Sequence, residues 1–311
     1  MQKWTTKLLK ISLSLAAAGL LLLGIGMASG AKTDFSRISH ERAKTIQNKR
    51  YDYQDLKKAT FFIPTGDILI KESSDSQFHV SYYQDPEQSK NPIVYKDGEL
   101  EIVEKDQSYF KKSVHVQTIL QYFLNQESIY TRKLILEIPK GKKLDLLDVT
   151  PYSGNLSIEK SAFKQLVLHS YTHDVNLSQV TIQQGTISVD NGQLTVKDSQ
   201  LNNLEFTSQR GELLLTKNKI TDSTFNWHRN IQGQDLSLEG TTSIQSELGQ
   251  VHLQLTPNSY EHLALDLSAS NGQIEIPHQT ASKDRQHLTY SPQNTKNKLI
   301  IKTTSGDILL K

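Results

Sequence analysis

One short phrase recurs along the chain: a glycine, usually a polar residue, and then a strand in which apolar and polar residues alternate. Its copies begin at Gly66, Gly154, Gly192, Gly211, Gly233, Gly249, Gly272 and Gly306. Alternation with a period of two gives a strand one apolar face, which a single copy cannot bury. Stacked copies pair their strands edge to edge and share an apolar interior. The phrase therefore predicts stacked β structure.

Between residues 144 and 238 the copies fall into units of about 20 residues, each with a strand, a turn and a second strand. The units span residues 144–163, 166–182, 187–201, 204–220 and 225–238. Glycine suits turns that require a positive φ or a close approach of neighbouring coils. In the second unit His173 and Asp174 take its place, and Asp also tolerates such corners. We predict an all-β fold, a β-solenoid or β-roll of stacked coils, over residues 59–311.

The residues ahead of this array predict strands and tight turns, with one interruption. In the strand expected over residues 77–83, His79 lies on the polar face, which predicts a solvated side chain. Residues 107–128 break the alternation with loosely spaced aromatic and aliphatic residues. We predict that they form a helix or hairpin that caps the open end of the stack. The alternative is an exposed insertion that contacts a partner or the membrane.

The first residues predict a membrane anchor. Three lysines precede an uncharged apolar run over residues 11–27. Lys10 is the one charged residue between residues 8 and 31, and a stretch of this length spans a hydrocarbon core. Basic residues before the run favour a cytoplasmic N-terminus and an extracellular body. We predict a single-pass cell-membrane protein with its anchor over residues 1–31 and a juxtamembrane stalk over residues 32–58. Small residues at positions 29–31 leave a cleaved signal sequence as the alternative.

The bulk composition excludes several classes of function. The formal net charge is +2, which favours neither a nucleic-acid partner nor a strongly acidic one. The chain contains no cysteine, which excludes disulfides, thiolate metal sites and cysteine nucleophiles. His169 and His173 have a spacing that would suit a metal on a helix, but they fall in a strand and a turn. We therefore expect no metal and no cofactor.

Departures from the glycine phrase mark the candidate binding surface. His173 and Asp174 replace glycine at one corner, and Trp227 and Arg229 flank the one aromatic and basic cluster of the array. An exposed indole beside a guanidinium can stack on a sugar or a peptide. Large aromatic side chains are mostly buried, so packing of Trp227 into the core is the favoured alternative.

An enzyme is an alternative class of function for this chain, because parallel β-helices include polysaccharide-active enzymes. Such enzymes need carboxylates clustered on adjacent coils. The candidates are Asp174, Asp190, Asp198 and Glu212, with His173 nearby. Aspartate at a corner is usually a turn residue, so we expect a non-enzymatic protein.

The ordered phrases also resemble those of a known family. They are Leu134-Ile135-Leu136-Glu137-Ile138-Pro139-Lys140-Gly141, then Leu144-Asp145-Leu146, then Ser153-Gly154-Asn155-Leu156-Ser157-Ile158. This set is similar to the LiaG-like putative-adhesin domain family, a domain of unknown function in Gram-positive bacteria, over about residues 59–311. The resemblance implies an exported, right-handed β-solenoid-like domain without established catalytic residues.

We therefore expect a cell-envelope protein that binds or scaffolds through its extracellular stack, with a cell-wall polymer or an envelope protein as its partner. Some members of the resembled family lie beside cell-envelope stress-response genes. One alternative is accordingly an accessory protein of an envelope-stress sensing system, and the other is the polysaccharide-active β-helix enzyme.

Overall fold

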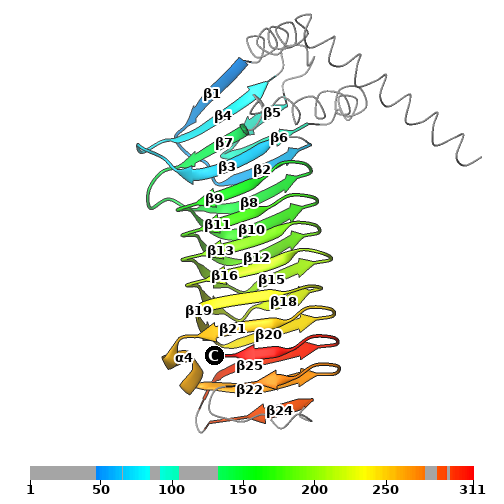
Figure 1. Cartoon of the computed structure of the whole chain (residues 1–311). Helices are drawn as coiled ribbons and strands as arrows, with labels where there is room; N and C mark the ends of the chain where they lie inside the picture. Colours follow the sequence, from blue (N-terminus) through cyan, green and yellow to red (C-terminus); the bar gives the residue numbers. More distant parts are fainter. Residues whose placement is uncertain (1–46, 65, 85–91, 105–131, 277–285, 293–294) are drawn as a thin grey trace, which may run out of the picture. The chain divides into compact units, whose positions relative to one another are not determined.

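The computed structural model describes residues 47–64, 66–84, 92–104, 132–276, 286–292 and 295–311. The chain divides into two compact units, residues 1–47 with 84–88, and residues 48–83 with 89–311. The predicted anchor and the 107–128 insertion lie outside the described residues. Within the described residues, no helix is long and apolar enough to cross a membrane. The described residues of the second unit are almost entirely β structure (Figure 1).

Its strands form two ladders that run the length of the stack. Sheet A contains β3 (Asp67–Glu72), β4 (Phe78–Gln84), β7 (Arg132–Ile138), β9 (Leu156–Glu159), β11 (Val175–Ser178), β13 (Gln193–Lys197), β16 (Glu212–Thr216), β21 (Val251–Leu255), β23 (Ile274–Glu275) and β26 (Ile308–Leu310). Sheet B contains β2 (Lys58–Ile63), β5 (Ile93–Lys96), β6 (Glu99–Val103), β8 (Leu144–Pro151), β10 (Ala162–Ser170), β12 (Thr181–Val189), β14 (Gln200–Asn202), β15 (Leu204–Ser208), β17 (Lys219–Thr221), β18 (Thr224–Trp227), β20 (Thr241–Ser246), β22 (Leu263–Ala269), β24 (His287–Tyr290) and β25 (Asn297–Thr303). The long strand β19 (Ile231–Glu239) pairs in both ladders, and a short helix, α4 (Pro257–Glu261), follows β21.

Successive coils pair in parallel and in register. Leu156, Val175, Leu194 and Leu213 are consecutive partners along sheet A. Equivalent positions such as Asp174 and Gln193 are 19 residues apart, which agrees with the predicted unit of about 20 residues. The structure is thus a mostly β, solenoid-like stack of parallel strands, as the repeated phrase predicts.

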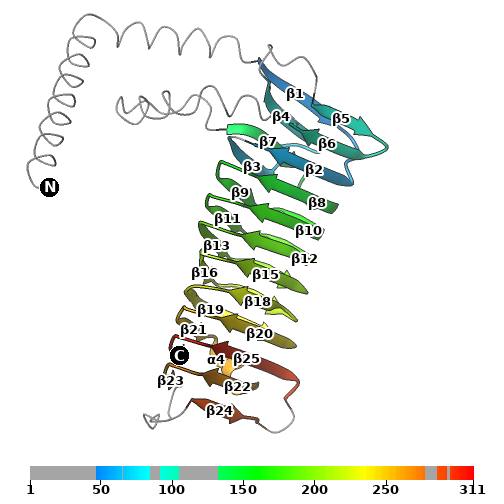
Figure 2. The ribbon, with the colours of Figure 1, turned by 90° about the vertical axis from the view of Figure 1, so that its right-hand side faces the viewer.

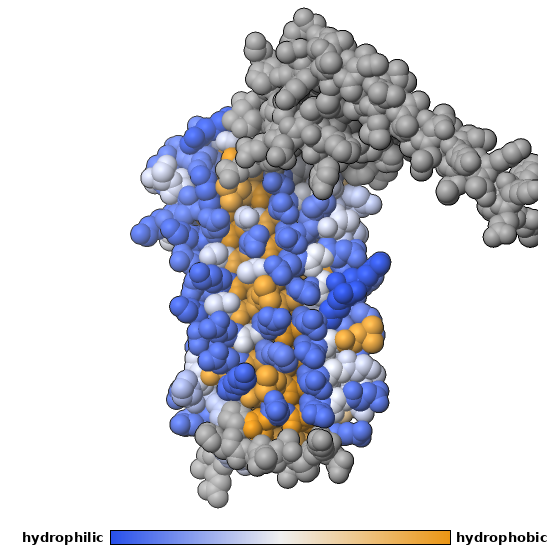
Figure 3. Space-filling model, viewed as in Figure 1, coloured by the Kyte–Doolittle hydropathy of each residue, from blue (hydrophilic) through white to orange (hydrophobic). Residues whose placement is uncertain are grey.

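The core fills the space between the ladders. The inward residues of every coil are buried, and Phe206 and Phe225 stack in it with ring centroids 4.4 Å apart. Because inward and outward residues alternate along each strand, they form columns along the stack. Figure 3 shows an apolar band that runs along the stack between columns of polar residues.

The order of the coils departs from the chain order at both ends of the stack. The coil of β2 and β3 lies between that of β6 and β7 and that of β8 and β9. In the same way, β25 and β26 lie between the coil of β20 and β21 and the coil of β22 and β23 (Figure 2). This explains why copies of the phrase occur at Gly66 and Gly306, far outside the central array.

Antiparallel strands cover the coils at each end. Strand β4 pairs antiparallel with β7, β5 with β6, and β24 with β22. Strand β1 (Gln47–Tyr53) pairs in turn with β4. The described β structure therefore begins within the segment predicted to be a stalk. The prediction missed β1 because this strand lies at the end of the stack, where its sequence needs no continuous apolar face.

Glycine is required at the corners that join sheet B to sheet A, here called the glycine corner. A Cβ added to Gly192 would lie 2.6 Å from the carbonyl oxygen of His173, and one added to Gly211 would lie 2.5 Å from that of Gly192. Real side chains do not tolerate such contacts with backbone atoms. The corners of successive coils therefore approach so closely that only a hydrogen atom fits between them.

Gly192→Ala is expected to destabilise the stack by roughly 2 kcal/mol or more, because it combines a backbone clash with a φ of 139°. Gly141→Ala is the matched control, since Gly141 also has a positive φ of 75° but nothing within 4 Å of an added Cβ. Equilibrium urea unfolding of both variants measures the difference. Equal losses of stability would contradict close approach as the reason for the glycine.

Candidate functional site

The aspartates of the glycine corner connect one coil to the next. Asp174 Oδ1 accepts a hydrogen bond of 2.8 Å from the backbone N–H of Gln193, one coil further along. Asp67 accepts from Asn155 at 2.8 Å in the same way, and so do Asn230 and Asp307 from the N–H groups of Gln250 and Gln273. The carboxylate or amide at this position of the corner thus satisfies a backbone donor of the neighbouring coil.

His173 lies at this corner, as predicted, but Trp227 does not lie on the surface. The Trp227 side chain is 1% exposed, and its indole Nε1 donates a hydrogen bond of 2.7 Å to the carbonyl oxygen of Gly211. The idea that Trp227 stacks on a ligand is therefore wrong, and the alternative of core packing holds. Trp227 pairs with Ser208 of the preceding coil, so the indole takes a position that a small side chain fills there.

Arg229 is exposed. It occupies the position of a corner glycine: its carbonyl oxygen would lie 2.1 Å from a Cβ on Gly249 of the next coil, just as that of Gly192 would lie 2.5 Å from a Cβ on Gly211. Along the corner, Gly192 and Gly211 separate Arg229 from His173. Strands in a ladder lie about 4.8 Å apart, so these two backbones are roughly 14 Å apart. The four predicted residues therefore do not converge on one point.

The structure instead brings a group of aromatic residues to the surface beside His173. The rings of Tyr152 and Tyr171 have centroids 5.1 Å apart, and His169 stacks on Tyr171 at 4.2 Å. His169 Nε2 lies 3.3 Å from Asp190 Oδ2, and 45% of Tyr152 is exposed. We call Tyr152, His169, Tyr171, His173 and Asp190 the aromatic patch. Alignment of successive coils would have revealed it, because Tyr152 and Tyr171 occupy the same position of adjacent coils.

The carboxylates considered for catalysis do not all lie at one corner. Asp198 has a φ of 50° at the opposite corner, where sheet A leads back to sheet B. Gln193 takes the position of Asp174 in the next coil and pairs with Glu212, so Glu212 lies two coils from Asp174. Among the residues that the structure describes, no group of three or more histidine, aspartate or glutamate side chains has the arrangement of a metal site.

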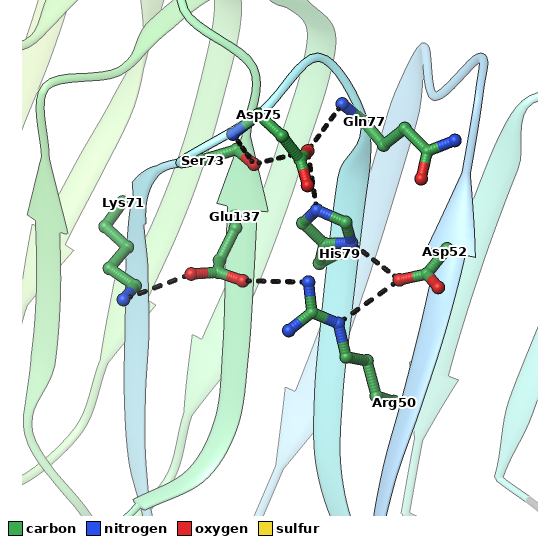
Figure 4. A network of polar contacts seen from close by, with 8 residues as sticks. All are labelled: Arg50, Asp52, Lys71, Ser73, Asp75, Gln77, His79 and Glu137. Atoms are coloured by element: carbon green, nitrogen blue, oxygen red, sulfur yellow. Dashed lines mark hydrogen bonds and ion pairs between the residues drawn. The ribbon is translucent and has the colours of Figure 1, made fainter.

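A second polar cluster lies at the end of the stack, around His79 of β4 (Figure 4). The prediction of a solvated His79 is wrong, because only 3% of this side chain is exposed. Its Nδ1 lies 2.6 Å from Asp52 Oδ1 on β1, and its Nε2 lies 2.7 Å from Asp75 Oδ1 in the β3–β4 connection. Strand β1, which the sequence did not predict, supplies one of the two carboxylates that cover the ring.

Further charges complete this cluster. Arg50 Nε lies 3.2 Å from Asp52, and the Arg50 guanidinium also lies 3.9 Å from Glu137 of β7. Lys71 of β3 is 3.1 Å from the other oxygen of Glu137. Three carboxylates therefore face two permanent cations and His79. The charges balance when the imidazole is protonated.

Two ionised carboxylates accept hydrogen bonds and cannot donate them, so the His79 ring must donate from both nitrogens. Burial lowers the pKa of His79, but the hydrogen bonds to Asp52 and Asp75 outweigh it, and the net pKa is raised. The hydrogen bond to His79 lowers the pKa of Asp52. The pKa of Asp75 is also lowered, mainly by the hydrogen bond from the Gln77 backbone N–H and then by the one to His79. The cluster thus favours an imidazolium between two carboxylates.

The stability of the stack is expected to fall as pH rises through the raised pKa of His79. A folded-state pKa above the unfolded value of about 6.5 means that this contribution is full below that pH and is lost above the folded pKa. The thermal unfolding midpoint, measured from about pH 6 to about pH 9, should decrease more in the natural protein than in His79→Gln. His252→Gln, at a half-exposed position on β21, is the control and should keep the natural pH dependence.

If the thermal unfolding midpoint of His79→Gln decreased with pH as steeply as that of the natural protein, the His79 ring would not be the titrating group.

Comparison with known proteins places the chain in a family. Among solved structures, it is similar to a putative adhesin of Bacteroides fragilis NCTC 9343, with 12% identity, 85% of this chain and 97% of that chain covered, and a TM-score of 0.43. It is also similar to a putative cell adhesion protein of Clostridium sporogenes ATCC 15579, with 10% identity, 85% and 99% covered, and a TM-score of 0.22. No curated protein matches the chain. A family match spans residues 62–311, which confirms the resemblance seen in the ordered phrases, and the chain belongs to the Toastrack DUF4097 family.

Proposed function

We propose that this chain is a non-enzymatic protein of the cell envelope. A single-pass anchor over residues 1–31 holds it, with the N-terminus in the cytoplasm, and the stack lies outside the membrane. There the stack binds or scaffolds a cell-wall polymer or an envelope protein. The observation that carries this proposal is the regular polar ladder on the outer surface of sheet B.

The ladder is built from outward residues in register on consecutive coils. Its columns contain Thr186, Glu205, Thr224 and Ser243, and beside them Ser188, Thr207, Asn226, Gln245 and Lys302. The side chains of each column repeat at the strand spacing of about 4.8 Å. A rigid array of hydroxyl, amide and charged groups suits an extended ligand that contacts several coils at once.

The aromatic patch lies at the edge of this ladder, since His169 is outward-facing on β10 and pairs with Ser188 of the next coil. Exposed tyrosine rings provide apolar contact area together with a polar hydroxyl group, a combination that is enriched at binding surfaces. Thr172 Oγ1 and His173 Nδ1, 2.6 Å apart, add hydrogen-bonding groups at the same corner. The patch and the ladder together form the surface that we assign to binding.

The non-enzymatic assignment is supported by the roles of the corner carboxylates. Asp174 accepts from a backbone N–H, and Asp190 faces His169, so each has a structural partner. A structural partner explains the position of each carboxylate without a catalytic role. The exported location is supported by the lysines and the apolar run of residues 3–31.

Crosslinking in intact cells tests whether binding resides in the stack. The full chain is compared with a chimera in which residues 1–46 are replaced by an unrelated single-pass anchor, which retains β1 and its pairing with β4. We expect the same crosslinked partners in both, because the stack carries the binding surface. Loss of these partners in the chimera would favour the alternative, an accessory protein that acts on a membrane sensor through its anchor.

Membrane fractionation tests the anchor. The full chain is expected to stay in the membrane pellet after high-salt and alkaline carbonate washes, because an apolar segment of this length partitions into the bilayer. A variant with Leu20→Arg and Leu22→Arg should be released, since each charge at the centre of a span costs about 2.5–3.5 kcal/mol. Release of the natural chain by these washes would contradict the proposed anchor.

A further inference from the structure

Several lysines gather on the corner opposite the glycine corner, near the start of β8. Lys164 Nζ lies 2.5 Å from Asp145 Oδ1. The hydrogen bond from Lys164 lowers the pKa of Asp145, and the charges of Lys57 and Lys143 act in the same direction. One carboxylate is therefore surrounded by three ammonium groups and cannot neutralise them.

The excess of positive charge extends to the neighbouring lysines. Lys142 and Lys160 are exposed, and together with Lys143 they make no ion pair with any residue that the structure describes. Lys57 pairs with Asp55 at 3.3 Å, and 56% of its side chain remains exposed. We call Lys57, Lys142, Lys143, Lys160 and Lys164 the lysine patch.

The patch spans three adjacent coils. The backbone N–H of Asp145 donates to the Lys57 carbonyl oxygen, which places Lys57 one coil before Lys143. Leu144 pairs with Phe163, which places Lys160 and Lys164 one coil after it. The ammonium groups thus follow the stack axis along one edge, on strands about 4.8 Å apart.

The two corners of the stack differ in charge. Among its described residues, the glycine corner carries six carboxylates, Asp67, Asp174, Asp190, Glu212, Glu247 and Asp307, and three arginines, Arg132, Arg210 and Arg229. A net charge of +2 for the whole chain conceals this separation. A polyanion is attracted to the lysine patch and repelled from the opposite corner.

We propose that the lysine patch binds a linear, phosphate-bearing polymer that lies along the stack axis. This proposal rests on the proposed function, because it names the chemistry of the envelope ligand. Lysine is a common phosphate ligand and acts as a point charge that tolerates variable spacing. A row of lysines on one edge fits an extended chain better than a flat membrane surface, which would require charges spread over a face.

Fluorescence anisotropy with labelled inorganic polyphosphate tests the patch on the full chain in non-ionic detergent. The triple variant Lys142→Gln, Lys143→Gln, Lys160→Gln should bind at least about tenfold more weakly, and its slope of log affinity against log salt should fall by about 2–3. Lys160 has a φ of 46°, and the next coil carries Gln179 with a φ of 55° at the equivalent corner, so glutamine fits there. An unchanged thermal midpoint confirms that the variant is folded.

The matched control is Arg210→Gln, Lys296→Gln, Lys311→Gln, which removes the same charge from exposed positions outside the lysine patch. An equal loss of affinity in this control would overturn the patch, because net charge would then explain the binding. Binding to anionic phosphatidylglycerol vesicles with none to polyphosphate would also overturn it, in favour of a membrane surface. Absence of polyphosphate binding overturns the patch whatever the cellular crosslinking shows, so the two proposals fail separately.

Discussion

The close approach of successive coils at the glycine corner is the constraint on which the other features depend. A carbonyl oxygen of one coil occupies the place where the next coil would carry a Cβ. The hydrogen-bonded ladders hold the coils in register at this close approach, and the register places equivalent side chains in columns. The buried core, the corner aspartates, the paired tyrosines and the lysines of adjacent coils all follow from it. Recurrent glycine is thus explained by backbone geometry and requires no ligand.

The ends of the stack obey a different constraint, because a parallel ladder has an unpaired edge that invites further association. Here the chain returns from a distant point to insert a coil near each end, and antiparallel strands cover the outer coils. The His79 cluster belongs to this arrangement, since it joins β1, β3, β4 and β7 through charged side chains. Removal of one partner from such a cluster leaves the remaining charge uncompensated. The N-terminal end therefore adds charged contacts to the apolar core, which continues through it with Phe61, Ile68 and Val80.

The sequence predicted the central coils well because each one repeats the same local pattern. Gly192, Gly211 and the alternating strands around them identify a corner and two faces without reference to distant residues. Strand β1 and the fate of His79 were missed because they depend on pairing between remote segments, which period and composition do not encode. Trp227 was assigned to two environments, and only its contact with Gly211 decides between them. The aromatic patch emerges only when adjacent coils are aligned, because Tyr152 and Tyr171 take the same position of neighbouring coils but share no local motif.

The separation of charge between the two corners follows from the same register. The buried core lies between the two sheets, so a residue at one corner cannot approach a residue at the opposite corner of its own coil. Lys143 and Lys160 therefore keep their neighbours from adjacent coils, and the carboxylates of the glycine corner remain on the other edge. In a flexible chain the lysines and the carboxylates could approach and neutralise each other, but here the rigid core keeps them apart. A stack that is nearly neutral in total can thus present one edge to a polyanion.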